Sequence, residues 1–223
     1  MTYTEKLRSI FEDCKNPVDA EKMSAYMREQ YVYFGLKSPE RKEAVKFFFK
    51  ENGYPNDINH TVKEWWNQPE REFQYAAMNL LEKNMKTAPV NRIELYEYLI
   101  INKSWWDTID MIAAKLVGHH FKIYPELIPH YTEKWMLSGN FWLQRSALLF
   151  QLKYKKDTNW NMMQSFILKL KDEKEFFIRK AIGWVLREYS KTYPDKVIEF
   201  IENTELSNLS KREGLKVIKR QMK

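Results

Sequence analysis

Apolar residues recur three or four positions apart along most of the chain, which is the spacing of an amphipathic helix. Clear examples are Leu7-Ile10-Phe11, Val45-Phe48-Phe49 and Val197-Phe200-Ile201. Breakers such as Asn16-Pro17, Gly53-Tyr54-Pro55, Gly139-Asn140 and Tyr193-Pro194 separate these runs. Since proline and glycine end helices, the pattern predicts an all-α protein whose helices are joined by short loops.

Two serines mark predicted helix starts. Ser38 is followed by Pro39 and Glu40, which fits an N-cap with proline in the first turn. Ser210 is followed three residues later by Glu213, which fits a capping box. Both helices are therefore predicted to begin at these serines.

Four segments of the chain align without gaps at an interval of 35 residues. They are EFQYAAMNLLEKN (72–84), DTIDMIAAKLVGH (107–119), WLQRSALLFQLKY (142–154) and FIRKAIGWVLREY (177–189). A repeat of this length is typical of stacked helix pairs, and the signature of tetratricopeptide repeats is absent. We therefore predict one helical-repeat domain over residues 1–223, an α-solenoid with a helical cap (1–69) and about four HEAT-like repeats (70–223).

The repeat register aligns Asp110, Arg145 and Lys180 in three successive units, with Tyr75 in the fourth. A regular stack would place these side chains in a row along one face. Because solenoids bind partners on their concave face, this row is a candidate binding surface.

Two helix faces carry chemistry beside that row. Trp106 precedes Asp110 by four residues, and Lys180, Trp184 and Arg187 follow the i, i+4, i+7 pattern. Residues at these spacings share a helix face. An acid, two indoles and two cations are therefore expected on one surface.

Charge is concentrated in the last third of the chain, whose net charge overall is +7. Residues 151–223 hold 17 Lys and Arg against 10 Asp and Glu, which leaves 20 of each in residues 1–150. This excess fits either a solvated lysine-rich surface or a footprint for a polyanion such as DNA or RNA.

The cysteine content and the hydropathy of the chain indicate its cellular location. One cysteine, Cys14, excludes a disulfide within the chain, and no apolar stretch is long enough for a signal peptide or a membrane span. We expect a cytoplasmic protein with no membrane partner, and a monomer.

Several chemistries are disfavoured by what the chain lacks. The four histidines, His60, His119, His120 and His130, include no pair at i, i+4, so neither a metal nor a cofactor is expected. No glycine-rich phosphate loop or G-x-S-x-G elbow occurs. The remaining carboxylates, aromatics and cations suit a polyanionic ligand that carries a local positive charge.

Six motifs resemble the bacterial DNA alkylation-repair glycosylases of the AlkD family, in the same order and over essentially the full chain. They are AYMREQYVYFGLKSPERK (25–42), QPEREFQYAAM (68–78), SWWDTID (104–110), NFWLQRSALLFQLKYK (140–155), EFFIRKAIGWVLREY (175–189) and LSKRE (209–213). The resemblance implies a HEAT-like fold whose concave basic face holds duplex DNA. It also implies excision of purines made cationic by alkylation at N3 or N7, with the base still stacked.

The resemblance also implies residue roles. Trp106 and Trp184 would be the aromatic pair beside the lesion and Asp110 the catalytic carboxylate; Asp107 does not match the family's acid. An indole attracts a cation by about 0.5–2 kcal/mol. A carboxylate about 4 Å from the cationic sugar formed as the base leaves would contribute on the order of 4 kcal/mol, roughly a thousandfold in rate.

DNA contacts are implied for Arg145, as a backbone clamp, and for Arg187 and Tyr26. Lys180 joins them because it lies in the basic third and in the aligned row. Ion pairs between neighbouring repeats are the alternative for Arg145, Lys180 and Arg187, and core packing is the alternative for Tyr26. A non-catalytic helical-repeat module that binds DNA or an acidic protein is the alternative for the whole chain.

The other tryptophans are interpreted as packing residues. They are Trp65, Trp66, Trp135, Trp142 and Trp160, with Trp105 also expected to point inward because its neighbour Trp106 lies about 100° away around the helix.

Overall fold

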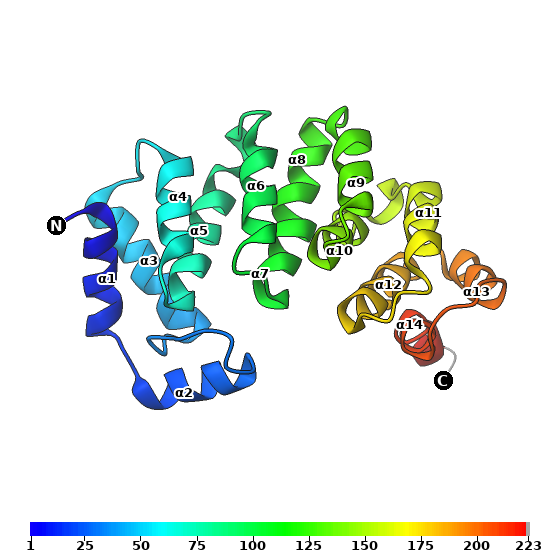
Figure 1. The fold of residues 1–223 in the computed structure, drawn as a ribbon, viewed down its shortest axis with the longest axis horizontal. Coiled ribbons are helices and arrows are strands. Elements are labelled where there is room, and N and C mark those ends of the chain that lie inside the picture. Colours follow the sequence, from blue (N-terminus) through cyan, green and yellow to red (C-terminus); the bar gives the residue numbers. More distant parts are fainter. Residues whose placement is uncertain (222–223) are drawn as a thin grey trace. The chain divides into compact units, whose positions relative to one another are not determined.

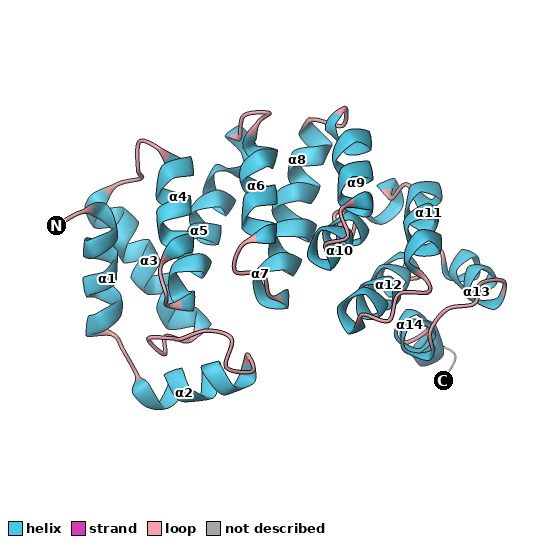
Figure 2. Ribbon diagram, viewed as in Figure 1, coloured by secondary structure: helices cyan, strands magenta, loops and turns pink. Residues whose placement is uncertain are grey.

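The computed structural model describes residues 1–221, which fall into two compact units, one from Met1 to Thr87 and one that begins at Ala88. Within the described residues the regular structure is helical, with no strand, as Figure 2 shows. One isolated parallel β-bridge joins Val32 to Glu70. The predicted all-α fold class is confirmed.

The first unit contains helices α1 to α5 (Figure 1). Their bounds are α1 Tyr3–Asp13, α2 Pro17–Tyr26, α3 Ser38–Asn52, α4 Ile58–Asn67 and α5 Arg71–Asn84, followed by a 3-10 turn, Met85–Thr87. Helix α4 packs against α5, and α1 packs against α3. Leu7, Phe11, Phe48, Trp65 and Phe73 are fully buried between them.

A buried carboxylate ties the loop before α3 to α5. Glu72 is fully buried and accepts hydrogen bonds from the backbone N–H groups of Phe34, Gly35 and Leu36 at 3.2, 2.9 and 3.2 Å. Gly35 has φ +96°, and a Cβ there would lie 2.0 Å from the carbonyl oxygen of Asn16. Only glycine therefore lets this loop reach the carboxylate.

The second unit contains the remaining helices. Their bounds are α6 Arg92–Ile101, α7 Trp106–Met111, a π-helix Ile112–Val117, α8 Gly118–Ile123, α9 Leu127–Leu137, α10 Phe141–Leu149, a 3-10 turn Lys155–Asp157, α11 Trp160–Leu170, α12 Phe176–Tyr189, α13 Pro194–Glu202, α14 Asn208–Gly214 and α15 Ile218–Gln221. Helix α10 contacts α6, α7, α9 and α12, and α12 contacts α14.

Helix pairs recur within the second unit (Figure 1). The first helices of the pairs, α6, α9, α11 and α13, begin at residues 92, 127, 160 and 194. Helices α6, α9 and α11 are each followed by a helix that carries one of the aligned segments, and α13 is followed by α14. Three aligned segments lie in this unit and the fourth lies in α5 of the first. The predicted single domain and its 1–69 cap remain predictions.

The polypeptide from Trp106 to Ile123 is helical without a break, but its middle section is a π-helix. Lys103, with φ +48°, and the extended Trp105 precede its first turn. Gly118, which follows the π-helix, lies so close to α10 that a Cβ would be 2.4 Å from the carbonyl oxygen of Phe150. π-turns are rare and occur often beside functional sites.

The N-cap of α3 lies one residue before the predicted position. Lys37 is the N-cap, and its backbone N–H donates to the Glu40 carboxylate at 2.8 Å. Ser38 is already the first helical residue.

The predicted capping box at Ser210 is wrong. Helix α14 begins at Asn208, and the hydroxyl of the true N-cap, Ser207, accepts from the N–H of Ser210 at 3.1 Å. Ser210 is buried, and its hydroxyl donates to the carbonyl of Arg179 at 2.9 Å, which docks α14 onto α12. Glu213 is therefore released from any capping role.

Four tryptophans are buried as predicted: Trp65, Trp66, Trp135 and Trp142. Trp160 is only half-buried, although its ring stacks on Tyr189 at 4.5 Å. Trp105 is half-buried too, and the centroid of its ring lies 5.4 Å from that of the Phe177 ring. No helix among the described residues is long and apolar enough to span a bilayer.

Candidate functional site

A cavity of about 260 Å³ lies within the second unit between α7, α10, α12 and α14. It is lined by Trp106, Asp110, Arg145, Phe176, Phe177, Lys180, Trp184, Arg187 and Glu213. Six of the seven residues singled out in the sequence therefore lie around one cavity. The seventh, Tyr26, belongs to the first unit, where it is 70% exposed beside a separate cavity.

Helical periodicity explains how each wall is built. Trp106 and Asp110 are one turn apart on α7, and Lys180, Trp184 and Arg187 occupy three successive turns of one face of α12. Both sets line the cavity. The predicted shared faces are therefore confirmed.

Asp110 and Arg145 form a bidentate ion pair. The guanidinium Nε donates to Oδ1 at 2.8 Å and Nη2 donates to Oδ2 at 2.9 Å. Nη1 donates to the carbonyl of Phe177. The Arg145 side chain is 5% exposed and the Asp110 side chain 20% exposed, so the carboxylate has an open side while the guanidinium is enclosed.

Burial raises the pKa of the Asp110 carboxyl above its usual range. The hydrogen bonds and the positive charge of Arg145 oppose this rise, and the negative charge of Asp107 adds to it. Each Asp110 oxygen accepts one hydrogen bond from Arg145, which leaves acceptor capacity for a further group. The site thus holds a negative charge in a poorly solvated position.

A second carboxylate, Glu213, faces the cavity from α14. Its Oε1 accepts from Nζ of Lys180 at 3.1 Å and its Oε2 accepts from Nη1 of Arg187 at 2.7 Å. The Lys180 and Arg187 side chains are 39% and 24% exposed, so both cations also reach solvent. The predicted possibility of ion pairs between neighbouring helices is confirmed for Arg145, Lys180 and Arg187.

The pKa of Glu213 is shifted in the opposite direction from that of Asp110. Burial alone would raise it, but the hydrogen bond from Lys180 and the charges of Lys180, Arg187 and Lys216 lower the pKa overall. Glu213 is therefore ionised over a wider pH range than an ordinary glutamate.

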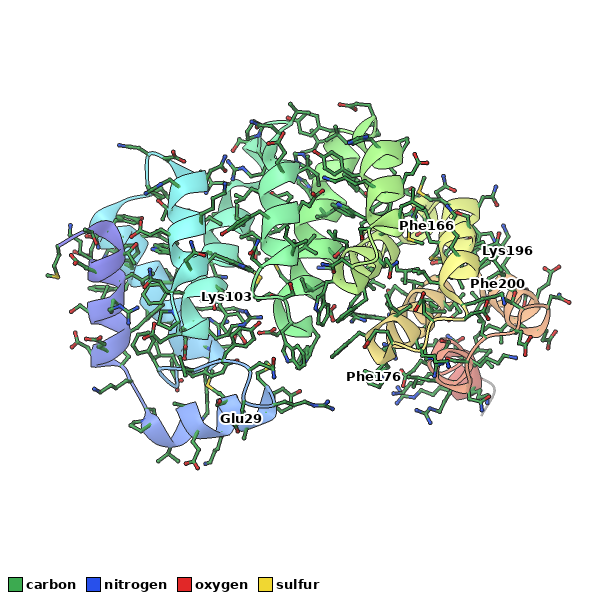
Figure 3. All side chains as sticks on the ribbon, viewed as in Figure 1. Glu29, Lys103, Phe166, Phe176, Lys196 and Phe200 are labelled. Atoms are coloured by element: carbon green, nitrogen blue, oxygen red, sulfur yellow. The ribbon has the colours of Figure 1, made fainter. Side chains whose placement is uncertain are left out.

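Aromatic rings form the other part of the lining. Trp106 and Trp184 are half-buried, whereas Phe176, labelled in Figure 3, is 53% exposed at the first residue of α12. The ring of Phe177 packs against that of Trp142, with centroids 4.9 Å apart. The cavity thus offers two indoles and two phenyl rings beside the Asp110 carboxylate.

Sequence reasoning missed Phe176, Phe177 and Glu213. The repeat register contained a signal for Phe176, because Trp106, Phe141 and Phe176 are 35 residues apart and all aromatic. It contained none for Glu213, because the interval from α12 to α14 shortens to 32 residues.

No group of three or more His, Cys, Asp or Glu residues within the described part of the chain is arranged to hold a metal ion.

Comparisons with known proteins give the class to which this fold and site belong. A family profile described as DNA alkylation repair enzyme matches residues 7–218, so the chain belongs to that family. It is similar to a solved structure described as a predicted DNA alkylation repair enzyme from Enterococcus faecalis, with 36% identity and a TM-score of 0.84. That match covers 91% of this chain and 95% of the other. A search of curated proteins found no match.

Proposed function

We propose that this protein is a DNA glycosylase that excises cationic N3- and N7-alkylated purines from duplex DNA. The observation that carries the proposal is the Asp110 carboxylate, partly open to a cavity whose lining includes Trp106 and Trp184. Membership of the DNA alkylation repair family supports a DNA substrate. No metal or cofactor takes part in the proposed reaction.

The recurring helix pairs support a HEAT-like solenoid, and we propose that its basic concave face holds the duplex. Helices α7, α10, α12 and α14 each follow another helix and pack in sequence order. This order is the nearest-neighbour arrangement of helical repeats. We propose that a single copy of the chain binds one lesion.

The reaction is hydrolysis of the bond between C1′ of the sugar and the purine. As this bond breaks, its electron pair goes to the base and neutralises the positive charge that alkylation placed there. The sugar becomes cationic, and a water oxygen then bonds to C1′ while its proton is lost. The products are a free alkylpurine and an abasic site.

Asp110 stabilises the cationic sugar and orients the attacking water. A carboxylate about 4 Å from the developing charge contributes on the order of 4 kcal/mol at an effective dielectric of 20, roughly a thousandfold in rate. Because the carboxylate is already held in place, no reorganisation is required when the charge forms.

Arg145 is assigned the role of holding that carboxylate. Three of its five N–H groups are bonded to Asp110 and to the Phe177 carbonyl. The Arg145 side chain is only 5% exposed, so we assign it this positioning role in place of a contact with the DNA backbone. Contacts with the duplex are proposed for Lys180, Arg187 and Tyr26, whose side chains are more exposed.

The indoles supply preference for a charged base. Trp106 and Trp184 attract a cation by about 0.5–2 kcal/mol each, more as water is excluded. A neutral purine gains no such attraction and leaves C1′ far less readily. Selectivity therefore comes from both the cavity and the weakness of the damaged bond.

The test is release of 7-methylguanine from a methylated duplex under single-turnover conditions, without metal. Asp110→Asn is expected to release the base about a thousandfold more slowly than the parent, because it removes the stabilising charge. Asp107→Asn is the matched control, since it removes the same charge one turn earlier, outside the cavity lining. Loss of the Asp107 charge lowers the pKa of Asp110, so Asp110 stays ionised and the variant should retain the parental rate near neutral pH.

Three outcomes contradict the proposal. Undiminished release by Asp110→Asn removes the mechanism. Duplex binding with a steep salt dependence but no base release indicates a DNA-binding module. Absence of duplex binding even at low salt indicates a protein adaptor.

A further inference from the structure

We infer that Glu213 is a positioning residue that holds Lys180 and Arg187 and offsets one of their two charges, so that the cavity accepts a cationic base beside a DNA-binding wall. This inference rests on the proposed glycosylase function and deepens it.

The first support is the reach of Glu213 across α12. Lys180 and Arg187 are seven residues apart, about 10.5 Å along the helix axis. One carboxylate nevertheless contacts both, at 3.1 and 2.7 Å. It therefore lies over the helix face between them, the face that also carries Trp184.

The second support is the close approach that allows this reach. Gly183 lies between the two cations on α12, and a Cβ there would be 2.5 Å from Cβ of Glu213 and 3.0 Å from the carbonyl oxygen of Ser210. Backbone and Cβ atoms cannot move aside cheaply, so the missing side chain at Gly183 creates the space for α14.

The third support is the charge balance of the cavity. Its lining carries three cations, Arg145, Lys180 and Arg187, and two carboxylates, Asp110 and Glu213. Arg145 is committed to Asp110 by two hydrogen bonds. Without Glu213, two uncompensated cations, each only partly exposed, would flank a position proposed for a cationic base and would repel it.

Lys180 and Arg187 must meet two opposing requirements, and Glu213 reconciles them. Positive charge attracts the phosphate backbone of any duplex, whereas the alkylated base and the sugar formed from it are themselves cationic. With Glu213 present, Lys180 and Arg187 keep one net charge for phosphate and remain fixed in position. A neutral residue in place of Glu213 should therefore favour undamaged DNA and disfavour the reaction.

The experiment compares Glu213→Gln with the parent in two measurements. The first is affinity for an undamaged duplex over a series of salt concentrations, and the second is single-turnover release of 7-methylguanine. Glu213→Gln is expected to bind the undamaged duplex more tightly, with a log–log salt slope steeper by about 1. It is expected to release the base roughly tenfold more slowly.

Two further variants separate charge from packing. Glu205→Gln removes an exposed carboxylate outside the cavity lining and should match the parent in both measurements. Glu213→Asp keeps the charge with a shorter side chain and should return the affinity for undamaged DNA to the parental value. A purely structural role of Glu213 would instead weaken binding and release together in both Glu213 variants.

The outcomes distinguish this inference from the proposed function. If the parent releases no 7-methylguanine, the proposed function fails. If the parent releases the base and Glu213→Gln matches it in affinity and rate, the inference alone is overturned. Tighter binding without slower release also overturns it, because the charge offset would then have no effect on the reaction.

Discussion

The two carboxylates of the cavity differ in the way each is held. Asp110 on α7 is held by the enclosed guanidinium of Arg145, which contacts both of its oxygens. Glu213 on α14 has two partners, Lys180 and Arg187, which are both partly exposed. Burial is the largest influence on each pKa, but the pKa of Asp110 is raised and that of Glu213 is lowered.

The balance between desolvation and neighbouring cations sets the direction of each pKa shift. One cation does not outweigh the cost of desolvating Asp110, whereas two cations and nearby Lys216 outweigh it for Glu213. The α7–α10 side of the cavity therefore holds a high-energy negative charge, suited to stabilise a transient cation. The α12–α14 side holds a stable charge, suited to position other groups.

Replacement of Arg145 should have the largest effect on stability of the variants that separate the two carboxylates. Arg145→Met leaves Asp110 buried without a partner, so the free energy of unfolding is expected to fall by about 3–5 kcal/mol in urea denaturation near neutral pH. The unpaired carboxyl has a folded-state pKa raised further above its unfolded value. Stability should therefore be lost as pH rises through the folded pKa and partly regained in acid.

Lys180→Met is the matched control for that replacement. It removes one partner of Glu213, but Arg187 remains and the lysine side chain is 39% exposed. A change below about 1 kcal/mol is expected. Equal losses in the two variants would contradict the distinction between the two sides of the cavity.

Gly183→Ala should disturb only the α12–α14 side. Its Cβ would overlap Cβ of Glu213 at 2.5 Å, so the helices must separate, at a cost of about 1–3 kcal/mol. Thermal denaturation measures this cost. Gly214→Ala is the control, because the nearest atoms to its Cβ would be Cδ1 of Ile201 at 3.1 Å and Cβ of Leu186 at 3.2 Å, well beyond the 2.5 Å at Gly183, and it should be tolerated better.

The smallest expected effect is the difference in pH dependence between base release and duplex affinity. Asp110 acts when ionised, and its pKa is raised. As the pH is lowered, base release should therefore begin to fall at a pH above the ordinary aspartate pKa of about 3.9. Glu213 has a lowered pKa, so the affinity difference between the parent and Glu213→Gln should persist at the same pH. Release and duplex affinity are measured over roughly pH 4 to 8, with protein-free DNA as the control for spontaneous depurination. Loss of both on one titration curve would contradict the separate shifts.

Much of the site could be predicted because it depends on residue spacings within single helices. The spacing of Trp106 and Asp110, and that of Lys180, Trp184 and Arg187, places each set on one helix face whatever the helix packs against. The four aligned segments also predicted which helices recur. Both patterns depend on the α-helical turn, which is the same in every protein.

The missed features depend on contacts between helices. Ser210 and Glu213 match a capping box in sequence, but Ser207 caps α14 instead, and Glu213 faces α12. Phe177 reaches the cavity because its helix packs against α10. No local pattern distinguishes these outcomes, since the same residues would satisfy a different packing equally well.

The order of residues along the chain is enough to predict the helical fold class, the recurring segments, the resemblance to a DNA alkylation repair family and the residues that share each helix face. The packed helices were needed to show that Arg145 holds Asp110, that Glu213 bridges Lys180 and Arg187, and that Gly183 makes this bridge possible. The two kinds of feature differ in the sequence distance over which they act. A helix face is set by hydrogen bonds four residues apart, whereas these ion pairs join residues 26 to 35 positions apart and exist only after whole helices have packed.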